Sequence, residues 1–187
     1  VFDENGRNTL TRAVSAENPG LAASDAAIAV WSAGGDALLV LDAEGKASEL
    51  AAEGAVYAVS ANGSGMLAVT TACEGYRGLV TVYDAALRPV YRWYAATAWP
   101  MAAALSPDGG TLAVLAASEE GGQLRLFSLA DEEELARFVS PGEVFFDLGW
   151  VDGGLCLVSE RRAVFLDAAG TAAGEYAFGS ARLADYA

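Results

Sequence analysis

The sequence predicts an all-β protein built from repeated units of four short antiparallel strands. Three observations lead to this prediction. Short apolar runs alternate with tight-turn signals, similar apolar runs recur at a nearly constant spacing, and each strand pair is followed by a second pair with its own polar turn. A unit of four strands in about 42 residues has the length of one β-propeller blade, so we expect a propeller-like architecture.

The clearest hairpin lies at residues 104–118, ALSPDGGTLAVLAAS. Pro107 sets φ at the second turn position, Asp108 can accept a hydrogen bond from its own backbone, and Gly109 tolerates a positive φ. The flanking segments are short and apolar, which is typical of strands buried on both faces. These residues therefore predict the first strand pair of a repeat, A and B.

Copies of this hairpin lie at residues 22–33, 59–72 and 148–160. Leu67, Leu112 and Leu155 begin matching apolar runs, at spacings of 45 and 43 residues, and Ile28 lies 39 residues before Leu67. A β-sandwich also uses many hairpins, but it would not be expected to repeat its turn chemistry at such a spacing. The repeats therefore favour a propeller.

A second hairpin, strands C and D, follows each first one. Its copies begin at Ala37, Gly78, Gly122 and Arg162, and the N-terminal residues 1–14 resemble an earlier copy with an Asn-Gly turn signal. The first turn residue of these hairpins is Asp3, Asp42, Asp84, Ser128 or Asp167. Because the acids recur at one turn position, we interpret them as turn residues rather than as a catalytic set.

Residues 130–138, ADEEELARF, contain good helix formers, so a short helix is an alternative there. The register of the other copies instead favours a turn followed by strand D. We predict a single β-propeller-like domain over residues 1–187, of about four and a half repeats, which is part of a larger propeller. A five-bladed ring closed by the last strand is the alternative. The predicted blade segments are 1–18, 19–54, 55–98, 99–142, 143–180 and 181–187.

Charge and composition exclude several classes of function. The chain has 25 acidic and 11 basic residues and a net charge of −14, which repels nucleic acid and anionic lipid headgroups. It has no histidine, so Ser-His-Asp catalysis and histidine-based zinc sites are excluded. We expect Cys73 and Cys156 to be free, buried thiols. No motif indicates a metal or another cofactor, and no apolar run reaches the roughly 18 residues needed to span a membrane.

Two levels of resemblance support the propeller prediction. The segments LSPDGGTLAV (105–114) and FSLADEEELARF (127–138) resemble strand pairs of the WD-repeat propeller superfamily, although the Gly-His and Trp-Asp marks are absent. More narrowly, residues 1–20 and 59–71 resemble an uncharacterised propeller-like family of Gram-positive anaerobes, which carry a domain of unknown function behind an N-terminal membrane anchor. This resemblance implies an extracytoplasmic location at the cell surface, with an anchor outside this chain. It implies no activity.

The candidate site residues lie in loops that a propeller gathers on one face, between strands B and C and between strands D and A. They are Tyr76, Arg77, Trp99, Glu119, Glu120, Glu143, Arg161 and Arg162, with Asp147 on a strand A that would line the channel. We predict a non-catalytic binding or scaffold module for a protein, peptide or glycan. An ordinary solvated loop face remains the simpler interpretation of these residues.

The alternative function is a carboxylate-dependent enzyme that acts on glycans in the propeller channel. Such chemistry needs two carboxyl groups about 5 to 10 Å apart. Asp147 is the one acid on the readable A strands, so it would need Glu143 or Glu120 beside it. We interpret Trp31, Trp93 and Trp150, which lie in or beside strand-like runs, as packing between blades.

Overall fold

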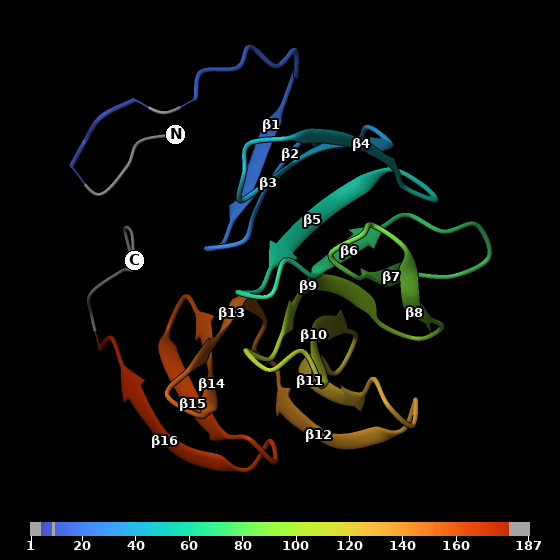
Figure 1. Cartoon of the computed structure of the whole chain (residues 1–187). Helices are drawn as coiled ribbons and strands as arrows, with labels where there is room; N and C mark the ends of the chain where they lie inside the picture. The colour runs from blue at the N-terminus through green and yellow to red at the C-terminus, as the bar shows by residue number, and fades with distance from the viewer. Residues whose placement is uncertain (1–4, 9, 180–187) are drawn as a thin grey trace.

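The computed structural model describes residues 5–8 and 10–179, and these form sixteen β-strands and no helix. The strands make four separate sheets of four antiparallel strands each (Figure 1). Within every sheet the strands lie side by side in chain order. This arrangement confirms the predicted all-β fold of four-stranded antiparallel units.

The four sheets are called blades 1 to 4. Blade 1 holds β1 (Pro19–Ala23), β2 (Ala27–Ser32), β3 (Ala37–Asp42) and β4 (Ala47–Ala51). Blade 2 holds β5 (Val56–Ala61), β6 (Leu67–Thr71), β7 (Gly78–Tyr83) and β8 (Pro89–Ala95). Blade 3 holds β9 (Trp99–Leu105), β10 (Thr111–Ser118), β11 (Gly121–Ser128) and β12 (Glu134–Pro141). Blade 4 holds β13 (Phe145–Val151), β14 (Gly154–Ser159), β15 (Arg162–Asp167) and β16 (Ala172–Ala177).

The blades follow one another around an arc (Figure 1). The first strand of each blade lies toward the middle of the arc, where β5 contacts β1 and β9, and β9 contacts β13. The last strands, such as β12 and β16, lie at the outside. This is the blade order of a β-propeller. Figure 1 also shows an opening between blade 1 and blade 4.

The recurring aspartates close the C–D turns. In Asp42, Asp84 and Asp167, Oδ1 accepts hydrogen bonds from the backbone N–H groups two and four residues further on, at 2.8 to 3.1 Å. Ser128 replaces the carboxylate with a hydroxyl that accepts a bond from the Asp131 N–H at 3.3 Å. Their interpretation as turn residues is confirmed, while Asp3 lies outside the described residues.

The A–B turns also join neighbouring blades. The Ser106–Gly109 turn has its expected backbone bond, from the Gly109 N–H to the Ser106 carbonyl at 2.9 Å, and Gly109 has φ +74°. In the preceding blade, Asn62 Oδ1 closes its own turn by accepting from the Ser64 and Met66 N–H groups. The Asn62 amide then donates to the Ser106 carbonyl at 3.2 Å, so one turn is tied to the next.

The hydrophobic core consists of three layers, one at each junction between consecutive blades. Leu67, Leu112 and Leu155, which begin the repeated runs, are fully buried against the preceding blade. Their spacings of 45 and 43 residues are therefore the spacings of equivalent core positions. Because most apolar contact is between blades, each blade depends on its neighbours for stability.

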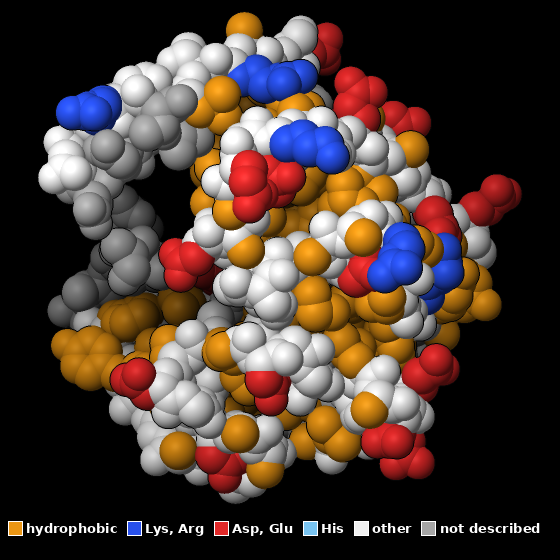
Figure 2. Space-filling model, in the orientation of Figure 1, with side chains coloured by type: hydrophobic (Ala, Val, Ile, Leu, Met, Phe, Trp, Pro, Cys, Tyr) orange, Lys and Arg blue, Asp and Glu red, His pale blue; other side chains and the backbone are white. Residues whose placement is uncertain are grey.

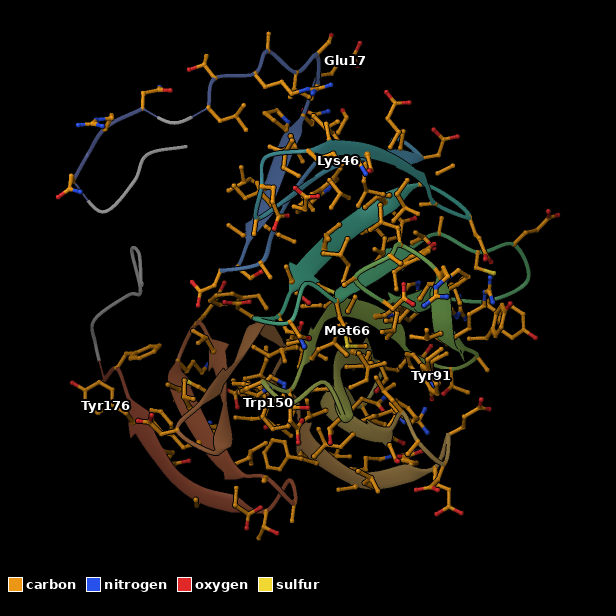
Figure 3. The ribbon with its side chains drawn as sticks, viewed as in Figure 1. Glu17, Lys46, Met66, Tyr91, Trp150 and Tyr176 are labelled. Carbon is orange, nitrogen blue, oxygen red and sulfur yellow. The ribbon has the colours of Figure 1, made fainter. Side chains whose placement is uncertain are left out.

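The tryptophans predicted to pack between blades do so. Trp31 is 8 % exposed in the layer between blades 1 and 2, and the Trp93 ring lies 5.4 Å from that of Phe127 in the next blade. Trp150 Nε1 donates to the Ala104 carbonyl of blade 3 at 3.3 Å. Figure 3 shows Trp150 toward the middle of the arc.

The hairpin expected in residues 1–14 lies only partly within the described residues, and none of the four described sheets includes its described part. Its turn signal is present, because Gly6 has φ +73° and Asn8 is a β-bridge residue. One prediction is corrected. Cys73 and Cys156 are free, as expected, but they are only half-buried. The possible helix at residues 130–138 is a turn followed by β12.

Candidate ligand-binding site on the loop face

The B–C and D–A loops meet on one face, as the sequence predicted. Backbone hydrogen bonds join them: the Gly34 N–H donates to the Val56 carbonyl at 2.9 Å, and the Gly142 N–H donates to the Glu120 carbonyl at 2.9 Å. The Arg77 N–H donates to the Ala95 carbonyl at 2.7 Å in the same way. These bonds fix the loop backbones and leave their side chains at the surface.

A recess opens on this face where blade 2 meets blade 3, and we call it the Trp99 recess. Its walls are Arg77, Thr97, Trp99, Ser118, Glu119, Glu120, Gln123, Arg137 and Val139. It brings together four of the nine predicted site residues, from loops more than forty positions apart in the sequence. Gln123 on β11 and Arg137 on β12 were not among the predicted site residues, because the prediction selected charged and aromatic loop residues and no residue of these two strands.

Trp99 is held at the surface by its neighbours in the chain. Pro100 restricts Trp99 to an extended backbone, and Pro100 itself is buried against Gly78, where a Cβ would come within 2.6 Å of the Pro100 ring. The Trp99 side chain is 44 % exposed. The Arg77 guanidinium lies 4.2 Å from the centre of its ring, a cation–π distance.

The charged walls of the recess differ in whether they have partners. Among the described residues, the Arg77, Glu119 and Glu120 side chains have no ion pair or side-chain hydrogen bond. Arg137, in contrast, donates to Glu134 at 2.9 Å. The recess therefore offers one uncompensated cation on an aromatic ring and two uncompensated carboxylates.

Ser118 makes two hydrogen bonds within the turn that carries the two carboxylates. The Ser118 hydroxyl accepts a hydrogen bond from the Glu120 N–H at 3.3 Å and donates to the Gly121 carbonyl at 3.2 Å. Tyr76 lies outside the recess, where its ring stacks against that of Tyr94 with the centroids 5.0 Å apart.

Glu143 and Arg162 lie where blade 3 meets blade 4. Glu143 accepts hydrogen bonds from Arg162 at 2.7 Å, from Ser159 at 2.6 Å and from Ser140 at 3.1 Å. Its side chain is 12 % exposed. Burial opposes ionisation of Glu143, but these hydrogen bonds, led by that from Arg162, hold its pKa below the ordinary value. Glu143 and Arg162 therefore clamp two blades together.

Arg161 and Asp147 occupy other positions. Arg161 lines a second recess together with Glu143, Val144 and Phe146, so this recess brings two of the predicted site residues together. Asp147 lies on β13, and the strand register places it on the same side of the sheet as Cys156. Burial and then the Asp147 charge raise the pKa of the Cys156 thiol. Neither residue lines the Trp99 recess. Within the described part of the chain, no group of three side chains is placed to hold a metal ion.

Comparison with family models identifies the chain. Residues 1–126 match the model described as Family of unknown function (DUF5711). The chain belongs to this family. No curated protein matches the chain. In the described residues of this DUF5711 member, no helix is long and apolar enough to cross a membrane.

Two solved structures show the same fold as this DUF5711 chain. Hydrazine synthase of Kuenenia stuttgartiensis aligns with a TM-score of 0.67 and 18 % identity, over 92 % of this chain and 53 % of that one. The Cps50 (Swd1) β-propeller domain of Myceliophteria thermophila aligns with a TM-score of 0.61 and 13 % identity, over 84 % of this chain and 59 % of that one. The chain thus spans little more than half of each structure, and the likeness concerns the fold alone.

The Glu143 clamp predicts how the stability of this DUF5711 chain depends on pH. The folded-state pKa of Glu143 lies below its unfolded value, and the pKa values of Asp84, Asp108 and Glu134 are also lowered. The stability that these groups add is complete at neutral pH and is lost as the pH falls through their folded-state pKa values. The free energy of unfolding in urea should therefore fall below about pH 4.5.

A matched variant isolates the contribution of the clamp. Glu143→Gln should be less stable at neutral pH and should lose less of its free energy of unfolding on acidification than the wild type. An identical pH dependence for the two proteins would contradict the assigned role of Glu143.

Proposed function

We propose that this protein is a non-catalytic binding module and that the Trp99 recess binds an extended peptide segment of a partner protein. One observation carries the proposal: an arginine without a counter-ion is stacked on an exposed tryptophan, beside two carboxylates without partners. Tryptophan and arginine are the residue types most often responsible for binding energy at protein interfaces.

The charges of the recess favour a peptide over a neutral glycan. Burying Arg77, Glu119 and Glu120 under a ligand costs free energy unless each charge gains a partner of opposite sign. A peptide with one acidic and at least one basic side chain supplies both signs, whereas sugar hydroxyls supply hydrogen bonds without charge. The exposed part of the Trp99 ring offers an apolar surface in the same recess.

Selection from a displayed library of short peptides tests this proposal. The enriched peptides should carry both charge signs, and Trp99→Ala should weaken their binding about 10- to 100-fold, because it removes the aromatic centre of the recess. Tyr57→Ala is the matched control, since Tyr57 is an exposed aromatic residue on β5 that does not line the recess. If Trp99→Ala leaves the affinity of the selected peptides unchanged, or if only Tyr57→Ala lowers it, the peptides bind outside the Trp99 recess. Failure to enrich any peptide, with glycans bound instead, would also overturn the proposal.

We further propose that the protein is displayed outside the cytoplasm, behind a membrane anchor that lies outside this chain. The resemblance of residues 1–20 and 59–71 to anchored proteins of Gram-positive anaerobes supports this location. A protease added to intact cells should cleave the protein. Cleavage only after cell lysis would contradict the proposed location.

A carboxylate-dependent glycan hydrolase remains the second candidate, and Asp147 and Glu143 would be its catalytic pair. The Glu143 clamp argues against Glu143 as the general acid, because the general acid of a glycosidase must be protonated near neutral pH. Glu143 instead has a lowered pKa and accepts bonds from Arg162, Ser159 and Ser140. Release of reducing sugar from glycans that is abolished by Asp147→Asn would favour the enzyme.

A further inference from the structure

The outward sheet face of blade 4 is largely apolar and is exposed among the described residues. It carries Val151, Cys156, Phe165 and Tyr176, which the strand register places on the side opposite to the core shared with blade 3. Asp147 and the buried Val158 lie opposite each other on the same side. Phe165 is 40 % exposed and Tyr176 is 67 % exposed. Figure 2 shows hydrophobic side chains gathered over this part of the molecule, and Figure 3 shows Tyr176 on the side that borders the opening.

The repeat itself shows what this face is built to contact. Cys156 pairs with Phe165 across β14 and β15. The equivalent pairs in the other blades are Ala113 with Leu126, Ala68 with Val82, and Ala29 with Val40. Each of those six residues is at most 6 % exposed, because the next blade covers it. In blades 1, 2 and 3, the residue pair equivalent to Cys156 and Phe165 is therefore covered by the following blade. In blade 4 this pair has no following blade among the described residues.

Blade 1 has the complementary face, which is only partly covered. Ile28 pairs with Leu41 on the side that the preceding blade would cover, where Ile28 is half-buried and Leu41 is 6 % exposed. The equivalent residues are Leu67 with Tyr83, Leu112 with Phe127, and Leu155 with Leu166, all at most 4 % exposed. Leu10 of the N-terminal segment lines a recess with Ile28 and Leu41, but Leu21 on the same face stays 67 % exposed.

We propose that further blades of the same polypeptide dock on the outward face of blade 4 and continue to the outward face of blade 1. Both faces border the same opening in the arc (Figure 1), so one run of blades covers both. The two faces are the opposite halves of the junction that is seen three times within the chain. The four blades also span only 59 % of a chain described as a β-propeller domain, which leaves room for such blades.

The Cys156 thiol reports directly on this docking, and Cys73 is an internal control on the loop between β6 and β7. The experiment compares the complete polypeptide encoded by the gene with the 187-residue chain. The rate of maleimide labelling is measured at each thiol and divided by its rate in urea-unfolded protein. Cys156 should be labelled at least about tenfold more slowly in the complete polypeptide, because a docked blade must open before the reagent reaches Cys156. Cys73 should react at the same rate in both proteins.

Three results would overturn the proposal. The first is equal labelling of Cys156 in the two proteins. The second is a labelling rate of Cys156 in the 187-residue chain that falls, as the protein concentration rises, to the rate seen in the complete polypeptide. That result indicates that a second copy of the chain covers the face. The third is a complete polypeptide without additional repeats. Phe165→Asp should restore Cys156 labelling in the complete polypeptide, while Val90→Asp, at an exposed position on β8, should leave it protected.

Discussion

Replacing Phe145 by alanine should lower the free energy of unfolding by about 3 to 5 kcal/mol, the usual cost of deleting a buried phenylalanine ring. Phe145 begins β13 and is 1 % exposed. Its ring lies 6.3 Å from that of Phe138 in blade 3, and it belongs to the apolar layer between blades 3 and 4. Its removal leaves a cavity where two blades meet. Urea unfolding followed by tryptophan fluorescence measures the loss.

The adjacent residue provides the matched control. Phe146 is 42 % exposed, so Phe146→Ala should cost less than about 1 kcal/mol. The strand register shifts between Phe145 and Asp147, so side-chain alternation alone does not decide which of the two phenylalanines is buried. A larger loss in Phe146→Ala than in Phe145→Ala would mean that β13 is displaced by one residue, which would turn its side chains to the opposite face.

Replacing Gly121 by alanine should destabilise the protein by roughly 3 kcal/mol or more, from backbone strain and steric overlap together. Gly121 has φ +132°, a conformation that residues with a Cβ rarely adopt. An added Cβ would lie 2.3 Å from the Ser140 carbonyl oxygen and 2.7 Å from the Gly142 nitrogen. These are backbone atoms of the adjoining strand and loop, so they cannot move aside as a flexible side chain could.

Gly149→Ala tests whether this cost is specific to Gly121. Gly149 lies within β13, has no positive φ and has no atom within 4 Å of an added Cβ. Alanine there should leave stability unchanged or raise it by up to about 0.5 kcal/mol, since glycine weakens a strand interior. Equal losses in the two variants, measured by urea unfolding, would contradict the assigned role of Gly121.

The fold could be predicted from the sequence because its turn chemistry repeats. Asp42, Asp84 and Asp167 each bind the same two backbone N–H groups of their own turn, so the acids mark equivalent positions along the chain. The N-terminal segment shows the limit of this reasoning. Gly6 has the positive φ that the Asn5-Gly6 turn signal predicts, but turn chemistry alone does not place this segment in one of the four described sheets.

The candidate site could be predicted only in part, because loop membership does not determine which side chains meet. Arg77, Trp99, Glu119 and Glu120 converge because their loops adjoin where blades 2 and 3 meet. Glu143 and Arg162 belong to the same kinds of loop but neutralise each other, since both approach the junction of blades 3 and 4. A sequence pattern shows the charges, whereas their pairing depends on how neighbouring blades are rotated against each other.

The most direct test of the account is an NMR titration that follows the indole N–H signals of the four tryptophans. The probe is a synthetic peptide enriched by the library selection, and each signal is assigned from a Trp→Phe variant. The account predicts that the peptide shifts the Trp99 signal, while Trp31, Trp93 and Trp150, which pack between blades, keep theirs. A peptide that binds without moving the Trp99 signal would contradict the claim that the Trp99 recess is the binding site.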